Sequence, residues 1–109
     1  MQEKGGQPAA GGEPEPWEGG PLFPLGQIVA TPGALHACDE AEVDPIDYLG
    51  RHVRGDWGDM VEEDIQANQQ ALEHGGRLFS AYNLPSRDRL WVITEADRTV
   101  TTILTPLEY

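Results

Sequence analysis

The sequence is poor in cysteine and contains no long apolar segment. Cys38 is the single cysteine, which excludes an intrachain disulfide and a zinc site assembled from several cysteines of one chain. No apolar run approaches the roughly 20 residues that a membrane-spanning helix needs, and the N-terminus lacks the basic and apolar regions of a signal peptide. These absences predict a soluble cytoplasmic protein without a membrane partner.

Basic residues are also scarce. The chain has 7 Lys and Arg residues against 19 Asp and Glu, for a formal net charge of −12. The imbalance lies in residues 22–76, which hold eleven carboxylates but only Arg51 and Arg54, whereas residues 77–109 carry four charges of each sign. A concentrated negative field repels phosphates and attracts cationic partners. We therefore expect no direct binding to nucleic acid and a protein partner with a basic surface, such as a nucleic-acid-handling enzyme.

Motifs of common catalytic sites are missing. The sequence has no serine nucleophile elbow, no glycine-rich phosphate loop before a helix and no Cys-His pair at a recognised spacing. The run from His36 to Glu40 places its potential ligands on different faces of a helix, which favours a solvated acidic side over a metal site. We predict no catalytic residue, no metal and no cofactor.

The first twenty residues differ in composition from the rest. Gly, Pro, Glu and Gln dominate residues 1–20, where Trp17 is the one large apolar side chain. Burying one side chain does not offset the entropy of ordering such a stretch, so we predict a disordered tail. Trp17 would be its single anchor, on a partner or on the domain. We expect residues 22–109 to form one small α+β domain.

Two short helices are predicted in the first half. A strand is predicted at residues 25–30. Thr31 followed by proline is typical of an N-cap and a first helical residue, so a short helix is predicted from Pro32 to about Ala41. Asp44 and the proline after it repeat the signal. Apolar residues spaced three and four apart then predict a second helix over residues 45–54.

A third helix carries the most start and stop signals. Asp59 is predicted to open it, with Glu62 three residues later as the reciprocal partner of a capping box. The helix is expected to run to about His74, where Gly75 and Gly76 provide a C-cap.

After Gly76 the repeat of apolar residues along the sequence changes from about 3.6 residues, typical of a helix, to 2 residues, typical of a strand. Residues 78–84, 90–95 and 100–104 read as strands separated by short turns, which predicts a three-stranded antiparallel β-meander. The predicted fold class is therefore α+β: a short N-terminal strand near Gln27, two to three helices, then the meander packed against the helices. The first strand would join at a sheet edge.

The predicted binding surface combines acidic residues with one aromatic residue and one hairpin turn. Trp57 lies between two glycines of one predicted turn, residues 55–59, where a large aromatic is either a plug that closes the core or an exposed anchor for a partner. The neighbouring acids do not have the spacing of an EF-hand. The residues of this surface are Asp56, Trp57, Asp59, Glu62, Glu63, Asp64, Glu95 and Arg98.

Four parts of the sequence resemble a family of small uncharacterised bacterial proteins. The resemblance rests on residues 26–35, on Arg51-His52 with residues 55–59, on residues 75–77 with 80–82, and on residues 91–104. Members are labelled plasmid-related or as a type I restriction subunit. The resemblance spans about residues 22–109 and implies a mobile-element setting, plasmid or phage, without a mechanism.

Two functions from different classes follow from these features. The first is a non-enzymatic binding protein whose acidic helical half engages a basic protein surface, in the manner of an anti-restriction or anti-CRISPR inhibitor. The alternative is a small enzyme acting on nucleic acid or a small molecule, with a polar site around His52, Asp56, Glu95 and Arg98. Charge favours the first, because a nuclease needs a basic path for phosphates.

Overall fold

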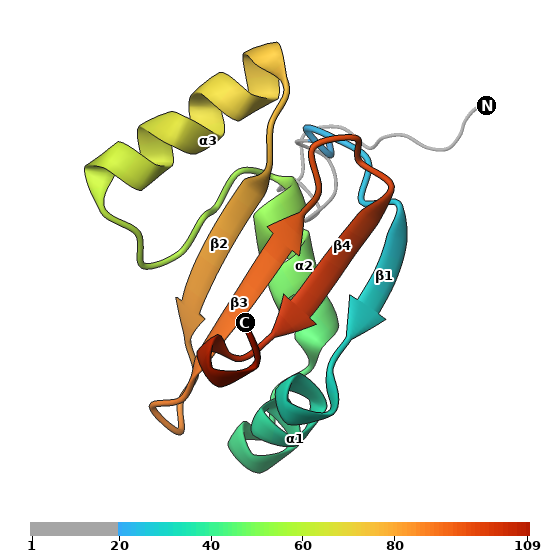
Figure 1. The fold of residues 1–109 in the computed structure, drawn as a ribbon. Coiled ribbons are helices and arrows are strands. Elements are labelled where there is room, and N and C mark those ends of the chain that lie inside the picture. The colour runs from blue at the N-terminus through green and yellow to red at the C-terminus, as the bar shows by residue number, and fades with distance from the viewer. Residues whose placement is uncertain (1–19) are drawn as a thin grey trace, which may run out of the picture.

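A computed structural model describes residues 20–109, and the predicted tail with Trp17 lies outside them except for Gly20. The described residues form an α+β fold, as predicted (Figure 1). Its elements in chain order are β1 (Gln27–Ala30), α1 (Pro32–Ala41), α2 (Pro45–Val53), α3 (Glu62–His74), β2 (Leu78–Asn83), β3 (Arg89–Thr94), β4 (Val100–Leu104) and a 3-10 turn, η1 (Pro106–Glu108).

The first two helices begin where local signals predicted. The Thr31 side chain accepts a hydrogen bond from the backbone N–H of Ala34, and the Asp44 carboxylate accepts one from Ile46. A proline occupies the first turn of each helix, where its missing N–H leaves no bond unmade. Both N-caps are confirmed.

The predicted capping box of α3 is wrong. The helix begins at Glu62 rather than Asp59, and its N-cap, Val61, makes no side-chain capping bond. The Asp59 N–H instead donates to the carbonyl of Ala81 at 2.7 Å, so this stretch lies along the outer edge of β2. Gly58 permits this approach, because its φ is +80° and a Cβ there would overlap the Ala81 carbonyl. Because this stretch pairs with the sheet, the helix begins three residues later than predicted.

The four strands form one mixed sheet in the order β1-β4-β3-β2. The last three strands are antiparallel neighbours, with Phe79 opposite Ile93 and Val92 opposite Ile103. The first strand extends them as a parallel neighbour of β4, with Gln27 opposite Val100. The predicted meander is thus part of a larger mixed sheet, because the chain crosses α1, α2 and α3 before β4 returns beside β1.

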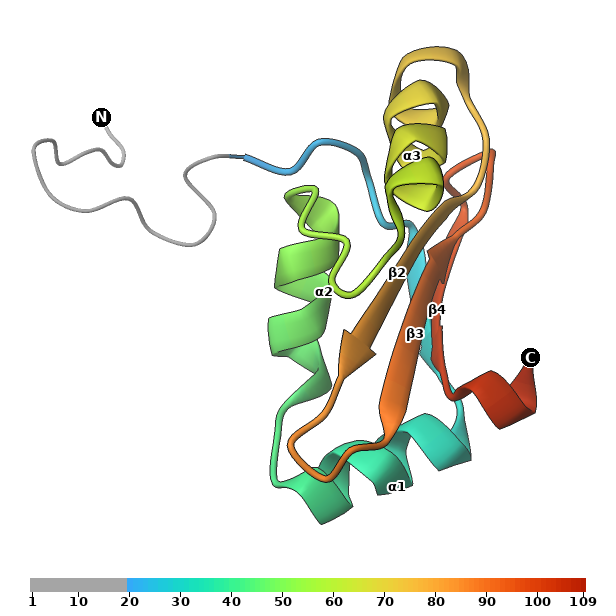
Figure 2. The same cartoon turned by 90° about the vertical axis from the view of Figure 1, so that its left-hand side faces the viewer.

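One face of the sheet carries most of the core. Helix α2 lies against this face, α1 closes one end and η1 lies on the other side (Figure 2). The main cluster includes Tyr82, Leu90, Val92 and Ile103. A second cluster gathers under α3 around Phe23, Trp57, Ala71 and Leu78.

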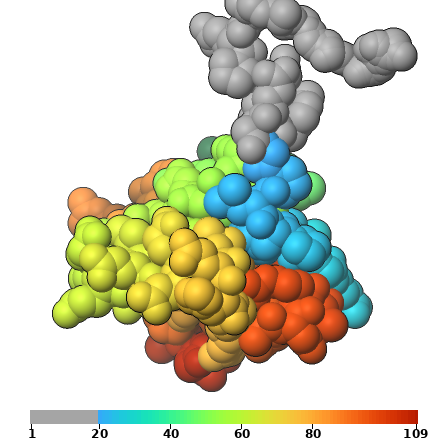
Figure 3. All heavy atoms as spheres, turned by 90° about the horizontal axis from the view of Figure 1, so that it is seen from above, coloured from blue at the N-terminus to red at the C-terminus, as the bar shows by residue number. Residues whose placement is uncertain are grey.

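Arg98 ties the β3–β4 turn to the end of α3. Its guanidinium donates to the carbonyl oxygens of Gly76, at 2.5 Å, and Ala71, at 3.0 Å, and also to two carbonyls of its own turn. Figure 3 shows the corresponding regions side by side on one surface of the molecule. These bonds hold the turn against the last turn of α3 and against the Gly76 carbonyl just beyond it.

We expect Arg98→Ala to lower the free energy of unfolding by about 2 kcal/mol, because it removes several charge-assisted hydrogen bonds. Arg87→Ala is the matched control. Both arginines have positive φ, 62° and 77°, but Arg87 makes no side-chain hydrogen bond to a described residue. Urea unfolding followed by circular dichroism measures the difference, and equal losses in the two variants would contradict this role of Arg98.

Candidate functional site

His52 is the centre of a buried polar cluster. Its Nδ1 lies 2.6 Å from the Ser80 hydroxyl and its Nε2 lies 2.9 Å from the Thr94 hydroxyl. The Thr94 hydroxyl in turn lies 2.7 Å from that of Thr101, which donates to the carbonyl of Leu25 at 2.7 Å. The four side chains of this cluster are completely buried.

The direction of these hydrogen bonds follows from counting protons. Each hydroxyl donates once, and the Thr101 proton is used on the Leu25 carbonyl, so Thr94 must donate to Thr101. Thr94 then accepts from His52 Nε2–H, which leaves His52 Nδ1 to accept from Ser80. The neutral histidine with its proton on Nε2 satisfies every member of the cluster.

Burial lowers the pKa of His52 from its ordinary value to about 4. The imidazole is enclosed by the rings of Phe23, at 5.2 Å, and Trp57, at 5.6 Å, both in edge-on contact. A cation there would lose its hydration without gaining a carboxylate partner. His52 is neutral and out of contact with solvent, which is the environment of a structural residue.

The structure separates the residues of the predicted enzyme site. Asp56 pairs with Arg51 at 2.7 Å, and this guanidinium lowers the pKa of the Asp56 carboxyl. Glu95 pairs with Arg77 at 3.3 Å on another part of the sheet. Arg98 is held by carbonyl oxygens, as described above. Within residues 20–109, no ion pair joins His52, Asp56, Glu95 and Arg98 to one another, and the hydrogen bonds among them are those that Arg98 donates to the backbone carbonyl of Glu95 inside the β3–β4 turn.

Trp57 takes the first of its two predicted roles. Its side chain is only 4% exposed and stacks on Phe23, with the ring centroids 6.3 Å apart. It closes the cluster under α3 and does not offer an anchor to a partner in this structure.

The acidic residues of the predicted surface divide into paired and unpaired groups. Asp59 pairs with Arg89 at 3.2 Å, and hydrogen bonds from Asn83 and Arg89 lower the pKa of its carboxyl. Glu62, Glu63 and Asp64 form the exposed first turn of α3, and no ion pair joins them to a cation among residues 20–109. The negative charge of this turn is therefore exposed and not neutralised by a cation of the described residues.

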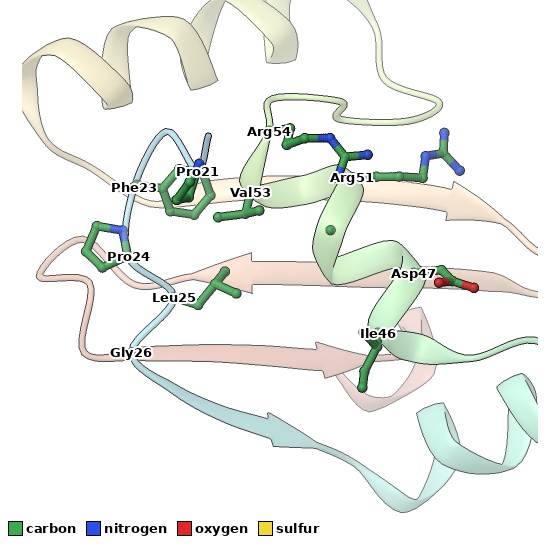
Figure 4. A pocket seen from close by; sticks show the side chains of 11 residues that line it. Pro21, Phe23, Pro24, Leu25, Gly26, Ile46, Asp47, Arg51, Val53 and Arg54 are labelled. Atoms are coloured by element: carbon green, nitrogen blue, oxygen red, sulfur yellow. The ribbon is translucent and has the colours of Figure 1, made fainter. Parts of the chain in front are cut away.

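An apolar groove of about 730 Å³ runs between α2 and the segment that precedes β1. Figure 4 shows its two walls, with Phe23 and Leu25 on one side and Val53 and Ile46 on the other. Arg51 and Arg54 lie at the C-terminal end of α2. Its size is within the range of ligand pockets.

Comparison with known proteins finds no matching family model, no matching curated protein and no matching solved structure. The family resemblance and the mobile-element setting therefore stay predictions. Among residues 20–109, no group of three or more His, Cys, Asp or Glu side chains is placed to hold a metal ion. In the same part of the chain, no helix has the length and apolar character needed to cross a membrane.

Sequence reasoning missed both the hydroxyl cluster and the groove. A signal for the cluster exists: strand alternation places Ser80 with Leu78 and Tyr82 on the core side, and Thr94 with Val92. Hydroxyls at inward positions of neighbouring strands indicate a buried polar partner. The groove has no such local signal, because its walls are separate in sequence.

Proposed function

We propose that the protein is a non-enzymatic binding protein from a plasmid or phage setting, which engages a basic surface of another protein. A nucleic-acid-handling enzyme is the partner class we favour, with inhibition of the anti-restriction or anti-CRISPR type as the outcome. The observation that carries the proposal is the exposed acidic turn of Glu62, Glu63 and Asp64 at the start of α3, whose carboxylates form no ion pair with a cation of residues 20–109.

The disposition of the arginines supports a protein partner over nucleic acid. Arg51, Arg77 and Arg89 are each paired with a carboxylate, and Arg98 is bound to backbone carbonyls. Phosphate binding needs a path of cations that are free to displace counterions. Four of the arginines are instead used inside the fold, while the acidic turn faces solvent.

The acidic turn also has a purely structural explanation, because carboxylates stabilise the positive end of a helix dipole. The two explanations differ in what charge removal does to binding. If the turn binds a basic partner, removing its charge weakens that binding and reduces its salt dependence. If the turn serves only the helix dipole, removing its charge changes the stability of the protein alone.

We expect the variant Glu62→Lys/Glu63→Lys/Asp64→Lys to capture its partner at least tenfold less well while remaining folded. The cations on the partner's surface lose several favourable charge pairs with this turn. Helix α3 also loses about 1–2 kcal/mol of dipole stabilisation. Partner capture from the host lysate at rising salt, followed by mass spectrometry, measures the effect. The purified chain should also fail to bind duplex DNA at low salt.

A matched control reverses Asp39, Glu40 and Glu42 at the other end of the helical half. This variant changes the net charge by the same amount, but the reversed charges lie near the C-terminus of α1, where cations are favourable. Equal losses of capture in both variants would replace the α3 site with a general charge effect. Undiminished capture by the α3 variant, or tight DNA binding by the wild type, would contradict the proposed function.

A further inference from the structure

The groove beside α2 combines an apolar interior with two arginine side chains. Arg51 and Arg54 are the only Lys or Arg residues of segment 22–76, which carries eleven carboxylates, and both line this groove. The opposite wall is apolar, with Pro21, Phe23, Pro24 and Leu25 among its members. A ligand that fits both features has an apolar body and an anionic group.

The two arginines are not equivalent. The guanidinium of Arg51 is used by Asp56 and lies over the ring of Tyr82, 4.6 Å from its centroid. Arg54 has no carboxylate of residues 20–109 within 4.0 Å, and it stands at the C-cap of α2. Arg54 is therefore the cation that can receive an anionic head group.

Gly50 leaves the middle of the groove open. It lies in the interior of α2, where glycine costs about 1 kcal/mol relative to alanine. A Cβ there would meet only the tip of the Arg54 side chain, at 3.3 Å, so the space above this residue is otherwise empty.

The groove also has a direction. Asp47 lines it near Ile46, which is 67% exposed, and a carboxylate there repels an anionic group. The guanidinium of Arg54 reaches back over Gly50, since a Cβ on Gly50 would lie 3.3 Å from its Nη1. The anionic group therefore belongs beside Gly50, and the apolar chain runs from there toward Ile46, a distance of about 6 Å along α2 at 1.5 Å per residue.

We propose that this groove binds a small linear acyl carboxylate, with its carboxylate on Arg54 and its chain between α2 and the Phe23–Leu25 wall. The apolar walls remove the chain from water, and the charge-assisted hydrogen bond to Arg54 selects the acid. This inference is independent of the acidic turn on α3 and of the proposed partner.

Decanoate is the probe, titrated into the full-length protein by calorimetry and by amide chemical shifts in nuclear magnetic resonance. We expect saturable binding that shifts Gly26 and Gly50, with decanol binding about tenfold more weakly. Arg54→Gln should weaken decanoate binding about tenfold and remove its advantage over decanol. Arg87→Gln, which makes the same charge change at a distant turn, should have no effect.

Gly50→Leu tests whether the ligand binds in the groove with a variant that is expected to stay folded. Leucine is a better helix former than glycine, so the variant should unfold at the same or a higher urea concentration, while its side chain displaces the tip of Arg54, fills the groove and abolishes decanoate binding. Binding that survives Gly50→Leu, or that is equal for decanoate and decanol, would overturn the proposal.

Discussion

Replacing His52 with alanine is expected to lower the free energy of unfolding at pH 7.5 by about 4 kcal/mol. The change removes a completely buried ring that packs on Phe23 and Trp57, and it leaves the hydroxyls of Ser80 and Thr94 without partners. Cavity formation and two unsatisfied polar groups each contribute to the loss. Chemical denaturation followed by circular dichroism provides the measurement.

His36→Ala is the control for this substitution, because His36 is an exposed residue of α1. It should change stability by less than about 0.5 kcal/mol, as exposed substitutions usually do. A similar small loss for His52→Ala would mean that the hydroxyl cluster reorganises around water and does not depend on the imidazole.

Stability is also expected to fall by up to about 3 kcal/mol as the pH decreases from 6.5 to 4. The pKa of His52 is about 4 in the folded protein, compared with 6.5 for an unperturbed histidine. Between these values the unfolded chain binds a proton that the folded chain does not, so acid favours unfolding. Urea midpoints measured at closely spaced pH values test this window.

His52→Asn supplies the control for the pH dependence. Asparagine carries a hydrogen-bond acceptor and a donor but no titratable proton, so its stability should be nearly constant from pH 6.5 to about 5. The lowered pKa of carboxyl groups such as those of Asp56 and Asp59 acts at lower pH, because their stabilisation is lost only as pH falls through their own values. An identical slope above pH 5 in wild type and His52→Asn would exclude His52 as the cause.

Local signals predicted the elements that depend on local chemistry. Thr31 and Asp44 cap their helices because the bond from each side chain reaches only a few residues along the chain. The period-2 pattern after Gly76 likewise placed both ends of β2, β3 and β4 to within one residue. These features depend on residues close together in the chain, so the sequence predicts them without knowledge of the tertiary contacts.

Predictions failed where a distant segment decides the local structure. Asp59 has the sequence of a capping residue, but its backbone N–H is taken by Ala81 and its carboxylate by Arg89. The parallel pairing of β1 with β4 and the groove beside α2 also join residues that are remote in sequence. Periodicity and capping rules contain no information about which distant segment arrives, so these features required the structure.

The parallel pairing of β1 with β4 has a consequence for the order of folding. During synthesis β1 leaves the ribosome long before its sheet neighbour β4 has been made. Until then its backbone donors, including the Gln27 N–H that bonds to the Thr99 carbonyl, have no sheet partner. The hairpin of β2 and β3 has no such delay, because its strands are adjacent in the chain. Long-range pairing of this kind slows folding. We expect β1 and the groove beside it to be completed late in folding, after β4 has joined the hairpin.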